Sequence, residues 1–145
     1  MKVLVIHGPN LNLLGKREPE IYGRHSLSDV NRLITDKAHE LGIEVRLEQR
    51  SSEGEIIDLI HSAVGWAEGI IINPAAYTHY SIAIRDALAA VSIPAVEVHL
   101  SNIFAREEFR QHSVISPVAK GVISGLGPWG YIYALEYLYQ MHLGE

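Results

Sequence analysis

Polar side chains that can move protons follow three short apolar runs of the chain. The three polar segments are residues 7–12, residues 73–79 and residues 97–102, the last of which begins inside its apolar run. Each segment holds both histidine and asparagine. Histidine is an effective general acid or base, and asparagine can hold a developing oxyanion. Any one segment could be a structural turn, because Asn, Pro and Ser are also common in turns. Their chemistry therefore depends on whether the fold brings the three together.

Several kinds of chemistry are excluded by what the sequence lacks. It has no cysteine, which removes disulfides, thiolate catalysis and cysteine-ligated metals. A net charge of −5 with scattered basic residues argues against a nucleic-acid partner. No lysine sits inside an apolar run, where burial could make it a Schiff-base nucleophile. The four lysines are Lys2, Lys16, Lys37 and Lys120.

Length and composition predict a single domain, residues 1–145, built around one core. The chain has 145 residues, of which 48% are hydrophobic and 20% charged, an ordinary globular composition. No window approaches the roughly 18 consecutive apolar residues of a membrane span. The apolar run near Met1 is too short for a signal peptide. We therefore expect a cytoplasmic protein with no membrane partner.

Short apolar runs alternate with amphipathic stretches along the whole chain. We expect strands at residues 3–6, 45–49, 70–72, 95–98 and 122–124, with helices between them. The clearest helix begins after Ser26, with Asp29 in a capping position, and ends at Gly42. Another spans residues 80–91, and the last begins near Pro128. Strict alternation with apolar strands predicts an α/β fold, a parallel sheet covered by helices on both faces.

Five strands in a chain of this length suit a flavodoxin-like three-layer sandwich with strand order 2-1-3-4-5. In such sheets, ligands bind beyond the carboxyl ends of the strands, where the order reverses between strands 1 and 3. All three polar segments follow strands that end at this edge. The pattern predicts one polar crevice, although topology by itself does not make it an active site.

Longer motifs resemble those of the type II 3-dehydroquinate dehydratases. One is GPNLNLLG at residues 8–15, followed by REP at 17–19 and YG at 22–23. Further matches in the same order lie at residues 73–74, 78–79, 85–86, 97–102 and 106–110. The resemblance runs essentially from end to end, and one departure is Ala75-Ala76, where many members carry glycines.

The resemblance implies a hydro-lyase that converts 3-dehydroquinate to 3-dehydroshikimate, the third step of the shikimate pathway. The reaction is an anti elimination through an enolate and needs no metal or organic cofactor. Members have the flavodoxin-like fold and assemble as homododecamers, each a tetramer of trimers.

The same resemblance assigns the catalytic roles. Tyr22 is the base that takes a proton beside the ketone, and Arg17 favours its phenolate. Both lie in a charged loop, residues 12–23, whose glycines and proline suit a closing lid. His99 is the acid for the leaving hydroxyl, and Glu97, two residues earlier on the strand, can hold its tautomer. Asn10 helps to hold the enolate oxygen.

The remaining residues are expected to bind substrate. Backbone N–H groups of Leu100 and Ser101 can form a small anion-binding nest for the substrate carboxylate, with the Ser101 hydroxyl and Asn73 as further donors.

Another set matches family residues that contact the substrate hydroxyls or a neighbouring subunit. His79 and Arg110 contact the ring hydroxyls in the family. Asp86 lies seven residues after His79, which would place both on one helix face, and in the family it reaches across a trimer contact. On the residues alone, a surface ion pair is slightly favoured for Asp86 and Arg110.

Other protein classes share this architecture. A flavodoxin-like electron carrier needs a glycine- and hydroxyl-rich phosphate loop after strand 1, where this chain has Pro-Asn-Leu-Asn-Leu. A phospho-acceptor receiver domain carries aspartates where this chain has Asn10 and Asn73. A third alternative is a family member that has lost activity and serves as a scaffold. The GxGxxG at residues 125–130 comes at the last strand, too late for a dinucleotide-binding βαβ unit, and no close metal-ligand motif occurs.

Overall fold

The computed structural model describes residues 1–16 and 18–144 as an alternation of strands and helices. The strands in this part are β1 (Lys2–His7), β2 (Glu44–Gln49), β3 (Gly69–Asn73), β4 (Ala95–His99) and β5 (Gly121–Ser124). The α-helices are α1 (Pro19–Tyr22), α2 (Leu27–Leu41), α3 (Glu53–Ser62), α4 (Ile82–Val91) and α5 (Trp129–Leu143). Short 3-10 helices occupy the loops at Leu11–Leu13, Ala75–His79, Ile103–Ala105, Glu108–Arg110 and Ser116–Val118. None of the described helices is long and apolar enough to cross a membrane.

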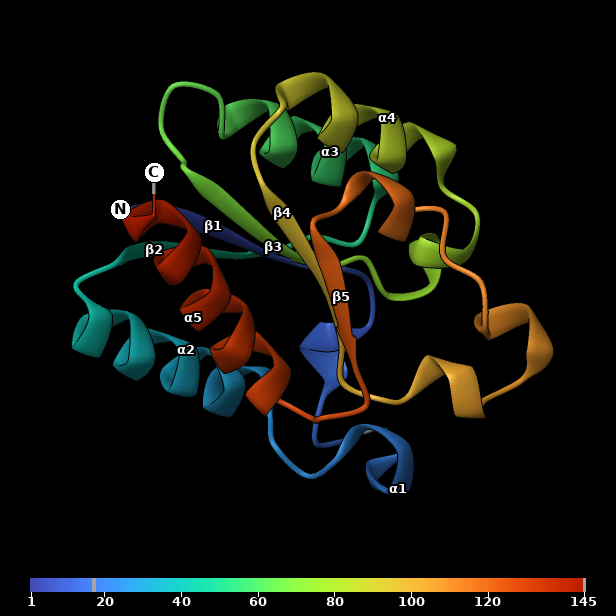
Figure 1. Ribbon diagram of the computed structural model, residues 1–145. Helices are drawn as coiled ribbons and strands as arrows, with labels where there is room; N and C mark the ends of the chain where they lie inside the picture. The colour runs from blue at the N-terminus through green and yellow to red at the C-terminus, as the bar shows by residue number, and fades with distance from the viewer. Residues whose placement is uncertain (17, 145) are drawn as a thin grey trace.

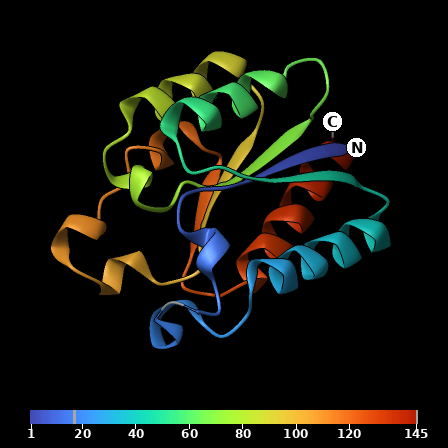
Figure 2. The ribbon, with the colours of Figure 1, turned by 180° about the vertical axis from the view of Figure 1, so that it is seen from behind.

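The strands form one parallel sheet in the order β2-β1-β3-β4-β5. Figure 1 shows α2 and α5 on one face of the sheet and α3 and α4 on the other, and Figure 2 shows the same layers from behind. The predicted fold class and strand order are confirmed. All carboxyl ends therefore lie along one edge, and β1 pairs with β3 where the order reverses.

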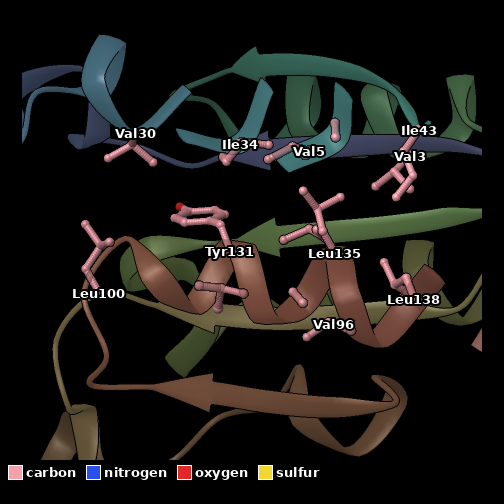
Figure 3. Packing of buried hydrophobic residues seen from close by; sticks show 14 of the residues in the cluster. Val3, Val5, Val30, Ile34, Ile43, Val96, Leu100, Tyr131, Leu135 and Leu138 are labelled. Carbon is pink, nitrogen blue, oxygen red and sulfur yellow. The ribbon is translucent and has the colours of Figure 1, made fainter. Parts of the chain in front are cut away.

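Side chains of the central strands point alternately into two cores, one on each face of the sheet. Val3 and Val5 of β1 belong to the core under α2 and α5, while Leu4 and Ile6 belong to the core under α3 and α4. Figure 3 shows the first core, where the ring of Tyr131 on α5 points toward α2. Burial on both faces explains why β1, β3 and β4 are continuous apolar runs instead of alternating ones.

Helix ends follow their sequence signals, with two exceptions. The Ser26 hydroxyl accepts from the Asp29 N–H at 3.1 Å, and the Asp29 carboxylate accepts from the Ser26 N–H at 3.0 Å, so the predicted cap is confirmed. The helix expected from residue 80 begins instead at Ile82, because Ser81 caps it through the N–H of Ile84. The polar loop at residues 12–23 also contains a helical turn, α1, that the sequence analysis did not predict.

At the edge where ligands are expected, Gly8 packs directly against the backbone of Asn73 and Pro74. Its N–H donates to the carbonyl of Asn73 at 2.8 Å, which joins the ends of β1 and β3. A Cβ at this position would lie 2.8 Å from the carbonyl carbon and oxygen of Pro74. These atoms are backbone and cannot move aside independently, so only glycine fits.

Gly8→Ala should therefore lower the free energy of unfolding by about 1–3 kcal/mol, the usual cost of overpacking. Denaturant titration measures this loss. Gly54→Ala is the matched control, because nothing lies within 4 Å of its added Cβ and alanine is the better helix former. Wild-type stability in Gly8→Ala would contradict the close contact.

Candidate active site

A pocket opens where β1, β3 and β4 end, and all three predicted polar segments line it. Of the predicted site residues, eight line the pocket, Glu97 lies outside the lining, and Asp86 is exposed elsewhere on α4. Arg17 lies outside the described residues. The lining residues are Pro9, Asn10, Leu11, Tyr22, Asn73, Ala75, Ala76, His79, His99, Leu100, Ser101, Ile103, Arg106 and Arg110.

The carboxylate of Glu97 is completely buried, with 0% of the residue exposed. It accepts hydrogen bonds from the hydroxyls of Thr78 at 2.7 Å, Ser116 at 2.6 Å and Ser113 at 3.0 Å. A buried carboxylate needs such donors, because removing its charge from water without them costs several kcal/mol. The sequence analysis did not predict these three hydroxyls, which hold Glu97 in one position.

His99 follows Glu97 by two residues on β4, so both side chains point to the same face of the sheet. The Nε2 atom of His99 lies 2.5 Å from Oε2 of Glu97. An ionised carboxylate can only accept, so Nε2 carries the hydrogen. The other ring nitrogen, Nδ1, has no hydrogen-bond partner among the described residues, and His99 lines the pocket. A protonated ring could therefore donate from Nδ1 to a bound ligand.

Opposing effects set the pKa of Glu97. Burial raises this pKa, whereas hydrogen bonds from His99, Ser116 and Thr78, together with the charge of His99, lower it. The balance holds the pKa of Glu97 below its ordinary value. Glu97 is therefore ionised at neutral pH and fixes the tautomer of His99.

Tyr22, the last residue of α1, lies beside an arginine from the far part of the chain. Nη1 of Arg106 donates to the Tyr22 hydroxyl at 3.0 Å, and the guanidinium carbon lies 5.2 Å from the centre of the Tyr22 ring. The same nitrogen lies 3.5 Å from the Ser101 hydroxyl. The sequence analysis assigned Arg106 no role. Tyr22 and Arg106 are 84 residues apart, so no local pattern could have paired them.

Donors for an anion meet at the ends of β3 and β4. The Asn73 side chain is held by the N–H of Ala75, which donates to its Oδ1 at 3.1 Å. The backbone N–H groups of Leu100 and Ser101 make no hydrogen bond within the described residues. These groups are available for a ligand.

His79 and Arg110 line the pocket from two separate 3-10 helices. The Nδ1 of His79 donates to the carbonyl of His112 at 2.8 Å, so its Nε2 is an acceptor when the ring is neutral. Burial lowers the pKa of His79, which favours that neutral form. Arg110 Nε donates to Glu107 at 2.5 Å.

Two predictions about Asp86 are corrected. It does not share a helix with His79, because His79 ends a 3-10 helix and α4 begins only at Ile82. Arg110 pairs with Glu107, and no ion pair of Asp86 occurs within residues 1–16 and 18–144, so the surface pair considered for Asp86 and Arg110 is wrong. Asp86 is exposed and is not among the residues that line this pocket.

Left-handed backbone shapes two points of the pocket. Asn10 has φ 72° and Ala75 has φ 54°, conformations that cost L-residues other than glycine free energy. Glycine would adopt the Ala75 conformation at a lower cost in free energy. Across the described ranges, no three or more His, Cys, Asp or Glu side chains are placed to hold a metal ion.

Comparison with known proteins identifies the family. The sequence model described as dehydroquinase class II matches residues 1–139. The chain belongs to the class II dehydroquinase family. It is therefore a lyase of the dehydratase type.

Individual class II dehydroquinases are similar over almost their whole length. The 3-dehydroquinate dehydratase of Halothermothrix orenii is 62% identical over 93% of this chain and 91% of its own. That of Pelotomaculum thermopropionicum is 56% identical over 94% of both chains. The crystal structure of the type II dehydroquinase from Butyrivibrio crossotus superposes with a TM-score of 0.94 at 52% identity, covering 95% of this chain and 97% of that one.

The buried carboxylate predicts a pH-dependent stability. The pKa of Glu97 is lower in the folded protein than in the unfolded chain, so its stabilisation is present above the unfolded pKa and is lost as pH falls through the folded pKa. The free energy of unfolding of the wild type should fall more between about pH 5 and pH 3 than that of Glu97→Gln. Glu108→Gln, at an exposed glutamate, is the control and should follow the wild type. Parallel curves for wild type and Glu97→Gln would contradict an ionised, hydrogen-bonded Glu97.

Proposed function

We propose that the chain converts 3-dehydroquinate to 3-dehydroshikimate in the shikimate pathway, in the cytoplasm, by anti elimination through an enolate and without a cofactor. The observation that carries this proposal is that His99 and Tyr22 line one pocket, each paired with a charged residue. Glu97 and His99 form one pair, and Arg106 and Tyr22 form the other. An elimination of water beside a ketone needs a base and a separate acid, which these pairs supply.

The base is Tyr22. Its hydroxyl lies 3.0 Å from a guanidinium nitrogen of Arg106, and a positive charge at that distance stabilises a phenolate. The family resemblance gives Arg17 the same task. The phenolate removes a proton from the CH₂ beside the ketone, and the electron pair moves onto the ketone oxygen to form the enolate. Asn10, which lines the pocket, holds that oxygen through a water molecule.

The acid is His99. The enolate collapses, the carbon–oxygen bond beta to the former ketone breaks, and the departing hydroxyl takes a proton from Nδ1 of His99. Glu97 keeps the hydrogen of Nε2 in place throughout, so only Nδ1 exchanges a proton with the substrate. The geometry thus separates the acid from the base, which lies on a different loop.

Substrate binding uses the remaining donors. The carboxylate of the substrate accepts from the N–H groups of Leu100 and Ser101 and from Asn73. His79 and Arg110 contact the ring hydroxyls. None of the four lysines lines the pocket, which favours an enolate over an imine intermediate.

Tyr22→Phe should reduce kcat by about 10²–10⁴-fold and leave substrate affinity nearly unchanged, because it removes only the proton acceptor. Ultraviolet absorbance follows the reaction, since the conjugated carboxylate of the product absorbs and the substrate does not. Tyr80→Phe, at a 62% exposed tyrosine outside the pocket, is the control and should retain full activity. An active Tyr22→Phe would require a different base. An inactive wild type would favour the scaffold alternative.

We also propose that the chain assembles as a homododecamer, a tetramer of trimers in which Asp86 reaches a neighbouring subunit. Aromatic side chains on the outer face of α5 support assembly: Trp129, Tyr133 and Tyr137 recur every four residues and are 50%, 49% and 45% exposed. Monomers rarely leave such an apolar stripe in water.

Sedimentation analysis should therefore give a mass of about 190 kDa, twelve times the chain mass of 16.1 kDa. Asp86→Ala should lower activity in the assembled protein if the carboxylate completes a neighbouring site. A monomeric mass in the active enzyme would contradict the assembly.

A further inference from the structure

A hydrogen-bonded chain of polar side chains leads from α2 to Asn73, and the proposed reaction uses none of its members except Asn73. His7, at the end of β1, and Tyr131, on α5, are 1% and 0% exposed. Nε2 of His7 lies 2.8 Å from Oδ1 of Asn31 on α2, and Nδ1 lies 3.1 Å from the Tyr131 hydroxyl. The same hydroxyl accepts from Nδ2 of Asn73 at 3.2 Å. These hydrogen bonds connect Asn31 on α2 with Asn73 in the pocket lining. Tyr131, in the middle of the series, is labelled in Figure 3.

A backbone group fixes the orientation of the Asn73 amide at one end of this chain. The N–H of Ala75 can only donate, so the atom of Asn73 that it meets must be the oxygen, and Nδ2 must face Tyr131. The Tyr131 hydroxyl accepts from Nδ2 and has one hydrogen to donate. Nδ1 of His7, 3.1 Å away, is the acceptor beside it within the described residues, and we assign the hydrogen to that bond. His7 then carries its hydrogen on Nε2 and donates to Asn31.

Burial keeps both titratable members neutral. It lowers the pKa of His7 to about 4, against a smaller opposing effect of the hydrogen bond to Asn31. It also raises the pKa of Tyr131 above its ordinary value. At neutral pH, His7 and Tyr131 therefore neither gain nor lose a proton. The directions of their hydrogen bonds stay the same during the reaction.

One hydrogen is left over at the end of the chain. The amide nitrogen of Asn73 has two hydrogens, and Tyr131 takes one. The other has no partner among the described residues, and Asn73 lines the pocket. A flipped amide would instead present its oxygen to the ligand, and that oxygen would repel an anion.

We propose that His7 and Tyr131 are positioning residues, whose relay to Asn31 fixes the Asn73 amide with an N–H donor directed at the carboxylate of the ligand. The identity of that carboxylate as part of 3-dehydroquinate rests on the proposed function, whereas the relay itself rests only on the side chains and the Ala75 N–H. The relay acts on binding and not on the proton transfers, which involve Tyr22 and His99.

Tyr131→Phe removes the relay hydroxyl and keeps the ring. It should raise KM for 3-dehydroquinate about tenfold, the equivalent of one lost hydrogen bond, with kcat per folded enzyme within about twofold of wild type. Tyr139→Phe is the control, because this partly buried tyrosine packs on the same core and its hydroxyl has no hydrogen bond among the described residues. In an Asn73→Ala background, Tyr131→Phe should raise KM no further, because the amide it positions is absent. Equal effects in both backgrounds, or a loss in kcat alone, would overturn the relay.

Neutron diffraction tests the relay without an activity assay. The crystals would contain wild-type protein in which exchangeable hydrogens have been replaced by deuterium. Deuterium should appear on Nε2 of His7, and the Tyr131 deuterium should point to Nδ1 of His7. Deuterium on Nδ1 of His7 would overturn the proposal even if the kinetics agreed. Failure of the wild type to convert 3-dehydroquinate would instead reject the proposed function, and the diffraction result would then decide the relay by itself.

Discussion

The burial of an ionised carboxylate at the end of β4 is the constraint on which the rest of the site depends. Glu97 has no contact with solvent, so its charge must be balanced by the hydroxyls of Thr78, Ser113 and Ser116 and by the ring of His99. Those hydroxyls belong to the segment after β3 and the segment before β5. The carboxylate therefore holds two loops as well as the histidine. These loops contribute further lining residues of the pocket, among them His79 and Arg110.

The polar residues His7 and Tyr131 obey the same rule. Both are buried in an otherwise apolar core, and each has hydrogen-bond partners there. Gly8 makes this arrangement possible, because only a residue without a side chain lets the end of β1 approach Asn73 and Pro74. The core thus supports buried pocket residues such as Asn73, and the more exposed Tyr22 and Arg106 complete the lining.

The sequence predicted those features that depend on a local pattern of residues along one strand or helix. The alternation of apolar runs with amphipathic stretches predicted a parallel sheet, and five strands in this length predicted their order. The two-residue spacing of Glu97 and His99 placed both on one face of β4. Contacts between distant segments were not predictable. Arg106 meets Tyr22 across 84 residues, and Tyr131 meets His7 across 124. The assumed helix through His79 and Asp86 failed because Ser81 caps α4 instead of continuing it.

The central claim is that base and acid are separate groups acting on one enolate, and deuterium uptake tests it most directly. His99→Ala should be incubated with 3-dehydroquinate in D₂O, and the recovered substrate examined by proton NMR. The account predicts deuterium at the carbon beside the ketone with little product, because Tyr22 still forms the enolate but the hydroxyl cannot leave. Tyr22→Phe should show neither exchange nor product. Product formation by His99→Ala at the wild-type rate, or exchange no faster than in Tyr22→Phe, would contradict it.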